Sequence, residues 1–149
     1  MGSLRQIVTN KQTLVMLTVP GRPCPKGRPR FASTGQAYTP ERTRIAEEMV
    51  RAYMRQACPI PLEGALELMV AFCFRRPQSW SKTRRDAVDD GDEPWYTGRP
   101  DLDNLVKTVK DAGGNGILWN DDAQFVKLEA LKVYSAESET VINVFSADE

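Results

Sequence analysis

The sequence predicts an α/β protein in which two main helices pack against one mixed β-sheet. Short runs rich in β-branched and apolar residues have the composition of strands, and two other segments repeat apolar residues at helical spacing. The order along the chain is strand, hairpin, helix, strand, loop, helix and two strands, which is typical of a layered α/β structure. The chain has 149 residues, so we expect one domain, residues 1–149, with its own core.

The first elements follow residues 1–12, which we expect to be flexible or peripheral. Residues 13–19 read TLVMLTV and predict a buried strand that is ended by a Pro-Gly pair. Residues 21–31 contain three prolines and two glycines, which exclude regular structure and leave four cations on an extended loop. Residues 33–36 predict the tip of a hairpin.

A first helix is predicted to run to about Ala57, with Thr39 as its N-cap, Pro40 at its first helical position and Pro59 as its stop. Helical spacing gives this helix a stripe that we expect to pack against the sheet. The stripe consists of Ile45, Met49, Ala52, Tyr53 and Gln56.

The middle of the chain predicts a strand and a long connection. Residues 62–74 predict a strand with one apolar face at a period of two. That face consists of Leu66, Leu68, Val70, Phe72 and Phe74. Residues 78–97 are polar and acid-rich, and we expect them to form a mobile loop.

The last third predicts a helix followed by strands. The helix runs from residue 101 to about residue 112 and ends at a Gly-Gly pair. Residues 117–119 form a short apolar element. Residues 124–134 and 140–145 predict a terminal pair of strands joined near residues 136–137.

Composition excludes several kinds of chemistry. The chain contains no histidine, which rules out Ser-His-Asp and Cys-His catalysis and His-ligated zinc. Its 20 basic and 20 acidic residues cancel, but they are segregated. Residues 1–60 carry a net charge of +7 and residues 61–149 a net charge of −7. The chain can therefore present a basic surface and an acidic site separately.

Cysteine content and hydropathy predict a cytosolic protein. The three cysteines, Cys24, Cys58 and Cys73, are an odd number without CxxC spacing, so we expect a reduced protein without a disulfide framework. The longest mainly apolar run, residues 62–74, is too short to span a bilayer. We therefore expect no membrane partner.

Four carboxylates in two segments are the strongest chemical signal. Asp101 and Asp103 open the second helix, one turn before Lys107, and Asp121 and Asp122 follow the short apolar element. Clustered carboxylates need a compensating cation, and oxygen ligands without His or Cys select Mg²⁺, with Mn²⁺ as a substitute. Such a metal activates water for phosphodiester hydrolysis, and a lysine can stabilise the charge that develops.

Each of these residues also has an ordinary structural interpretation. Asp101 is placed to cap the helix, and Asp103 and Lys107 have the spacing of a helical ion pair. Asn-Asp-Asp, residues 120–122, is typical of a turn. Their combination favours a functional site.

The two segments resemble the RusA family of Holliday-junction resolvases of bacteria and their phages. The family signature is a PDLDN-L-x-K helix followed by W-x-DD-x-Q; here PDLDNLVK occupies residues 100–107 and WNDDAQ occupies residues 119–124. The likeness extends over most of residues 13–145 and includes PKGRPRF at residues 25–31, YTP at residues 38–40, Gly98-Arg99 and Lys132. The long acidic segment 78–97 and the Gly113-Gly114 pair depart from the family pattern.

The resemblance implies a single RusA-like endonuclease domain that acts as a Mg²⁺-dependent homodimer. Such enzymes cut four-way DNA junctions by paired, symmetric nicks in recombination and repair, without a nucleotide cofactor. The family's essential aspartates match Asp101, Asp103 and Asp122, and its essential lysine matches Lys107. Asp121 is the adjacent acid, either a supporting ligand or a turn residue. The family also implies a bacterial cytosolic or nucleoid protein, encoded by a bacterium, phage or prophage.

The cationic loop is the expected DNA contact. Prolines hold it extended, so its cations can follow a phosphate backbone with little ordering cost, although a solvated loop is the ordinary alternative. Further cations flank the acids or lie on the following strand. The candidates for DNA binding are Arg22, Lys26, Arg28, Arg30, Arg99, Lys127 and Lys132.

Two other functions remain compatible with the sequence. A catalytically inactive relative would only bind junctions, and the intact set of acids argues against it. A Mg²⁺-dependent phosphohydrolase of small molecules would have no use for the basic N-terminal loop.

Overall fold

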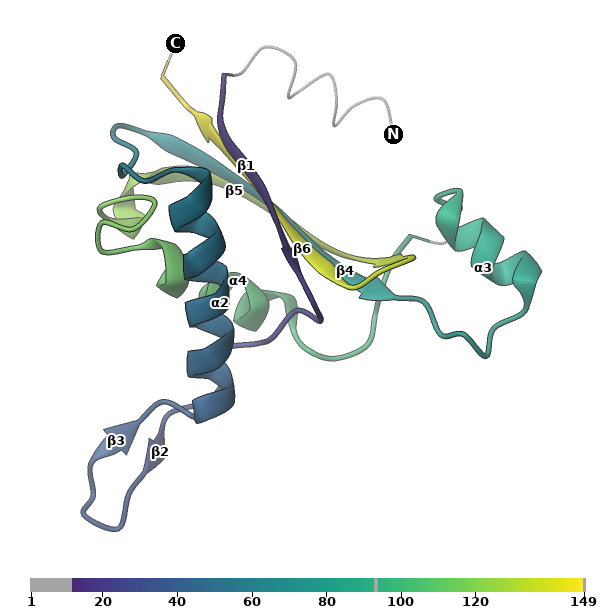
Figure 1. Ribbon diagram of the computed structural model, residues 1–149, viewed down its shortest axis with the longest axis horizontal. Helices are drawn as coiled ribbons and strands as arrows, with labels where there is room; N and C mark the ends of the chain where they lie inside the picture. Colours follow the sequence, from purple (N-terminus) through teal and green to yellow (C-terminus); the bar gives the residue numbers. More distant parts are fainter. Residues whose placement is uncertain (1–11, 93, 149) are drawn as a thin grey trace.

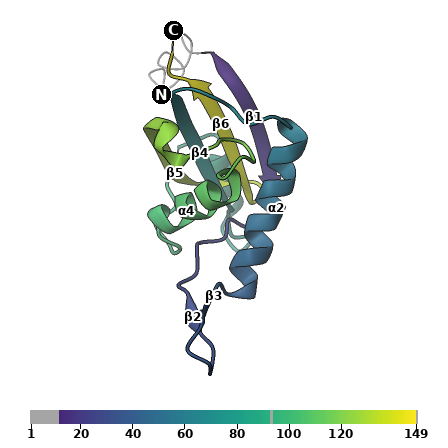
Figure 2. The same cartoon turned by 90° about the vertical axis from the view of Figure 1, so that its left-hand side faces the viewer.

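The computed structural model describes residues 12–92 and 94–148, so the expectation for residues 1–11 lies outside the described residues. A four-stranded mixed sheet carries two long helices on one face (Figures 1 and 2). This architecture confirms the predicted α/β class and the two main helices on a mixed sheet. The strands are β1 (Thr13–Pro20), β4 (Leu66–Arg75), β5 (Phe125–Ser135) and β6 (Glu139–Ser146), and the helices are α2 (Glu41–Ala57) and α4 (Leu102–Gly113).

The strand order is β1-β6-β4-β5. β6 is antiparallel to both of its neighbours, whereas β4 and β5 are parallel. The predicted terminal strands β5 and β6 both exist, but the expectation that they form a pair is wrong, because β4 lies between them. β4 is the strand with the longest buried stretch, and a central position covers its two edges.

The core lies between the sheet and the two helices. The predicted face of β4 is confirmed, since all five of its apolar side chains are almost completely buried. Alternate residues of β1 and β6 extend the same face. The helices cover it with Val50 and Met54 of α2 and with Leu105, Val109 and Ala112 of α4.

Helix α2 is rotated relative to the prediction. It begins at Glu41, with Pro40 rather than Thr39 in the N-cap position and without a side-chain cap. Most of the predicted stripe is wrong, because Ile45 is 55% exposed and Met49 is 42% exposed, although Tyr53 packs against the core. The buried residues are Thr43, Val50 and Met54. The polar contacts of Thr43 and Glu47 with residues 26–27 turn this side inward.

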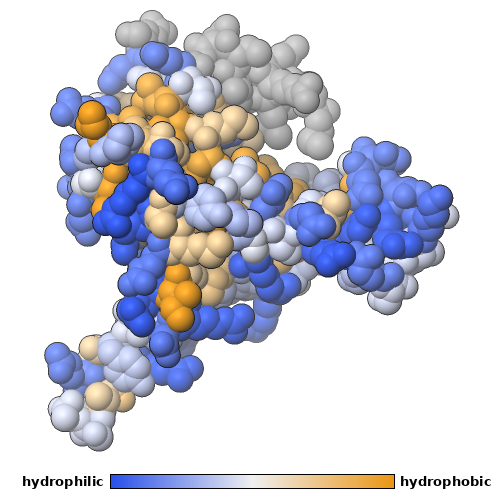
Figure 3. Space-filling model, viewed as in Figure 1, coloured by the Kyte–Doolittle hydropathy of each residue, from blue (hydrophilic) through white to orange (hydrophobic). Residues whose placement is uncertain are grey.

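Residues 78–97 are not simply a loop. They contain helix α3 (Lys82–Asp89), whose first turn is capped by the Ser81 hydroxyl, which accepts a hydrogen bond from the Arg84 amide. Arg76 binds both carboxylate oxygens of Asp89 at 2.9 and 3.0 Å. The expectation of a mobile loop therefore missed a capped and ion-paired helix. α3 projects from one end of the sheet with a hydrophilic surface (Figures 1 and 3).

The predicted hairpin is confirmed and projects from the opposite side of the molecule (Figure 1). It consists of β2 (Arg30–Phe31) and β3 (Ala37–Tyr38), with Arg30 paired to Tyr38. Among the described residues, no helix is long and apolar enough to cross a membrane, and all three cysteines are free.

Candidate functional site

The N-terminus of α4 presents two exposed carboxylates. Asp101 occupies the N-cap position, but its side chain makes no capping hydrogen bond, so the ordinary interpretation of this residue is not realised. Asp103 follows in the first turn and is also exposed. The positive end of the helix dipole favours negative charge at this position. Both carboxylates are therefore available to a ligand.

Lys132 positions the segment that leads into these acids. Its ammonium group donates hydrogen bonds to the carbonyl of Gly98 at 2.7 Å and to that of Pro100 at 2.8 Å. It also lies 5.6 Å from the centre of the Tyr96 ring. The sequence predicted Lys132 as a DNA contact, but the structure uses its charge to tie β5 to the chain just before Asp101.

Lys107 lies one turn after Asp103 on the same side of α4. In the described part of the chain, these two side chains form no ion pair within 4.0 Å, so the ordinary interpretation of their spacing is not realised either. Both line a shallow groove between α4 and β5. The other residues of this groove are Leu102, Asn104, Val106, Lys110, Leu128 and Ala130.

Asp121 and Asp122 have different local roles. Asp121 is a turn residue: its carboxylate accepts a hydrogen bond from the Ala123 amide at 2.8 Å and caps a short 3₁₀ helix, η1 (Asp122–Gln124). Asp122 is exposed, and its Oδ1 accepts a hydrogen bond from the indole Nε1 of Trp119 at 2.7 Å. Trp119 is fully buried, so it holds the Asp122 carboxylate in a defined place.

One chain does not bring all the predicted acids together. Asp122 lies beside the C-terminal end of α4, because a Cβ atom on Gly114 would be 3.3 Å from its Oδ1. Asp101 and Asp103 lie at the other end of this 12-residue helix, about 18 Å away at 1.5 Å per residue. Accordingly, no three Asp, Glu or Cys side chains within residues 12–92 and 94–148 are grouped so that they could hold a metal ion.

Gly113 is required by the packing of Trp119. A Cβ atom at Gly113 would lie 2.3 Å from the indole ring. The free energy of unfolding of the Gly113→Ala variant is therefore expected to be about 1–3 kcal/mol lower than that of the wild type, because the rigid ring must move. Gly114→Ala is the matched control, since the closest contact there is 3.3 Å and it is expected to cost less. Urea unfolding measures both, and equal stability of the two variants would contradict this explanation of the Gly-Gly pair.

Five arginines surround a pocket next to the acids. The loop after β1, the start of α2 and the segment before α4 contribute its walls, which also contain several prolines. Arg42 was missed by the sequence analysis, because nothing in the sequence places the first turn of α2 beside the loop. The arginines are Arg22, Arg28, Arg30, Arg42 and Arg99.

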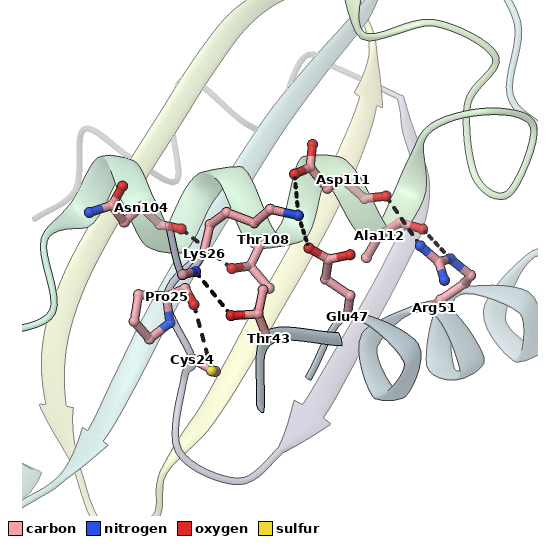
Figure 4. A network of polar contacts seen from close by, with 11 residues as sticks. Cys24, Pro25, Lys26, Thr43, Glu47, Arg51, Asn104, Thr108, Asp111 and Ala112 are labelled. Atoms are coloured by element: carbon pink, nitrogen blue, oxygen red, sulfur yellow. Dashed lines mark hydrogen bonds and ion pairs between the residues drawn. The ribbon is translucent and has the colours of Figure 1, made fainter. Parts of the chain in front are cut away.

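Lys26 points away from this pocket. Its ammonium group forms ion pairs with Glu47 of α2 and, at 3.1 Å, with Asp111 of α4 (Figure 4). Its backbone amide donates to the carbonyl of Asn104 at 3.0 Å. Burial by itself lowers the pKa of Lys26, but the two carboxylates outweigh that effect and raise it. Lys26 thus joins the loop to both helices, and DNA contact by this side chain stays a prediction that these ion pairs disfavour.

Comparison with known proteins identifies the family of this chain. The sequence profile of the family described as Endodeoxyribonuclease RusA matches residues 20–145. The uncharacterized protein YqaN of Bacillus subtilis (strain 168) is 32% identical over 130 residues, which cover 83% of this chain and 89% of YqaN. A crossover junction endodeoxyribonuclease, rusA of Lactococcus phage r1t, is 42% identical over 50 residues, which cover 34% of this chain and 38% of the phage protein. Because the family profile matches most of the length of this chain, the chain belongs to the RusA endodeoxyribonuclease family.

Proposed function

We propose that this protein is a Mg²⁺-dependent endonuclease that resolves four-way DNA junctions by paired, symmetric nicks and acts as a homodimer. One observation carries the proposal. Arg99 and Pro100 belong to the wall of the five-arginine pocket, and the next residue is Asp101, whose carboxylate is exposed and does not cap its helix. A DNA phosphate held by the arginines therefore lies next to the acids. Membership of the RusA endodeoxyribonuclease family supports the same activity.

The donor set suits the metal that the family implies. Asp101 and Asp103 offer carboxylate oxygens at one end of α4, and Asp122 offers another at the opposite end. Oxygen donors alone are the preference of Mg²⁺ and Mn²⁺. When bound, such an ion would supply an activated water and charge stabilisation at the scissile phosphate. Asp121 is less suited to be a ligand, because its carboxylate already caps η1.

The separation of the acids favours a homodimer. Because Asp122 lies at the far end of α4, it cannot join Asp101 and Asp103 of the same chain without a large rearrangement. A two-fold axis beside the middle of α4 sets the start of one helix next to the end of the partner's helix. The partner's Asp122 would then complete each site. Two such sites related by a two-fold axis also match the symmetry of a four-way junction and its two cuts.

The side chains of this chain have separate roles in the proposed reaction. The arginines of the pocket bind and orient the phosphate backbone, which gives affinity without sequence information. Lys107, exposed one turn after Asp103, stabilises the negative charge that builds up on the phosphate during attack. Lys132 donates hydrogen bonds to the carbonyls of Gly98 and Pro100 and so fixes the position of the backbone that leads into Asp101.

The test is incubation with labelled four-way, flap and linear duplex DNA, with and without Mg²⁺. We expect paired nicks in the four-way junction only when Mg²⁺ is present, and binding that weakens steeply as salt is raised. Binding without nicks at any Mg²⁺ concentration would instead indicate an inactive junction-binding protein. Hydrolysis of small phosphate esters together with salt-insensitive DNA binding would indicate a phosphohydrolase.

A further inference from the structure

The first half of β5 has an open edge. β5 is an outer strand of the sheet, and within residues 12–92 and 94–148 only its second half is covered, by the chain around Trp95. There the Tyr96 amide donates to the carbonyl of Lys132 at 3.1 Å, and the Tyr134 amide donates to that of Pro94 at 2.7 Å. Among the described residues, no segment pairs with the same edge at residues 127–130. Open edges of this kind are sites of pairing with another chain.

The direction of the free backbone groups follows from these hydrogen bonds. The carbonyl of Lys132 and the amide of Tyr134 point outward, and β5 pairs regularly with β4 from Lys127 to Ser135. Backbone groups alternate along a strand with a period of two. The N–H and C=O groups of Leu128 and Ala130 therefore also point to the open edge.

We propose that residues 127–129 pair antiparallel with the same residues of a second copy of this chain, with the two-fold axis at Leu128. This deepens the proposed homodimer by naming its interface. In this register, the outward backbone groups of Leu128 meet those of the partner's Leu128. Lys127 lies directly opposite the partner's Glu129, and Glu129 lies opposite the partner's Lys127. The charges on this edge are thus complementary to the charges on the same edge of a second copy.

The geometry of antiparallel pairs strengthens this match. The two Lys-Glu pairs fall at positions without backbone hydrogen bonds between the strands, where opposing side chains are closest. Neither Lys127 nor Glu129 has an ion-pair partner within the described part of its own chain. On the helix face, Leu128 is 50% exposed at the mouth of the groove between α4 and β5. The partner's Leu128 would cover that apolar surface.

The same register explains how the acids meet. β5 runs antiparallel to α4, because Lys132 contacts Pro100 at the start of the helix and η1 leads into β5 beside Gly114 at its end. An axis at Leu128 places the partner's Phe125 opposite Leu131, near the start of α4. The partner's Asp122, three residues before that, then reaches the end of α4 that carries Asp101 and Asp103. The other outer strand, β1, packs beside α2.

The test is sedimentation equilibrium of the full chain, which needs no nuclease activity and can fail independently of the proposed function. We expect a wild-type dimer. Lys127→Glu and Glu129→Lys each place like charges opposite one another twice, and each is expected to raise the dimer Kd about ten- to hundredfold. Mixing the two variants in equal amounts restores both attractive pairs, so a heterodimer is expected. The double variant Lys127→Glu/Glu129→Lys is expected to dimerise like the wild type.

A second pair of variants separates the two outer strands. Leu128→Arg is expected to give a monomer, whereas Met16→Arg on β1, where Met16 is 68% exposed, is expected to leave the dimer intact. Circular dichroism checks that each variant is folded. A wild-type chain that stays monomeric at tens of micromolar, a mixture that does not restore dimers, or a Leu128→Arg variant that still dimerises would each overturn the proposed interface.

Discussion

Replacing Asp103 with Asn is expected to reduce Mg²⁺-dependent junction cleavage on the order of 10³-fold and to leave DNA binding intact. Asn keeps the size of the side chain but removes a negative charge from the exposed start of α4. Loss of one carboxylate from a metal site removes several kcal/mol of transition-state stabilisation. Binding is retained because the arginines that surround the neighbouring pocket are unchanged. Cleavage assays and gel-shift titrations of the same junction measure the two effects, and undiminished cleavage would contradict the proposed mechanism.

Mixtures of inactive variants test whether each site is shared between two chains. Asp122→Asn is also expected to be inactive, and its amide oxygen can still accept the hydrogen bond of Trp119. In a mixed dimer of Asp103→Asn and Asp122→Asn chains, one site would contain both changes and the other site neither. With free exchange of subunits, half of the dimers are mixed, so roughly a quarter of wild-type nicking is expected to return.

The control is a mixture of Asp101→Asn and Asp103→Asn chains. Both changes lie at the same end of α4, so every site in the mixed dimer keeps one damaged acid. We expect no recovery of nicking in this control mixture. In the first mixture, each mixed dimer has one intact site, so the recovered activity is expected to give single nicks rather than paired cuts. No recovery in the first mixture, with dimers present, would show that each site is built from one chain.

Lys26→Met is expected to lower the free energy of unfolding by about 3 kcal/mol. The Lys26 side chain is 19% exposed and its ammonium group lies between Glu47 and Asp111, so its removal leaves two neighbouring carboxylates without a counter-charge. Urea unfolding at neutral pH measures the loss. Because the folded state raises the pKa of Lys26, its stabilisation is fully present below the pKa of the unfolded chain. The stability difference between wild type and variant is therefore expected to shrink in alkaline solution, as the pH rises through the folded pKa.

Arg28→Met is the matched control for Lys26. It removes a cation two residues away that is exposed and lines the arginine pocket. Its stability is expected to stay within about 0.5 kcal/mol of wild type, whereas the salt dependence of DNA binding is expected to fall by about one unit of slope. If Lys26→Met instead changed the salt slope and left stability intact, Lys26 would be a DNA contact as the sequence suggested.

Local sequence patterns predicted most of the helices, strands and turns, because the residues that determine each of them are neighbours in the sequence. Alternating apolar residues in β4, the Gly-Gly end of α4 and the turn of the β2–β3 hairpin each depend on a few neighbouring residues. The short helix α3 was missed because most of its residues are polar or charged, although the serine that caps it was a usable signal. The rotation of α2 was missed because polar side chains form part of its buried stripe.

The sequence by itself determined the α/β class, the order of nearly all elements and the presence of both a set of acids and a basic loop in one chain. These features follow from residue type and spacing. Only the tertiary structure decided which charges are free, because an ion pair such as that of Lys26 depends on segments far apart in the chain. It also decided where the acids lie: α4 is a rigid rod, and it holds Asp101 and Asp103 at one end and Asp122 at the other. Spacing along a sequence does not contain that distance, and the proposal of a second chain rests on it.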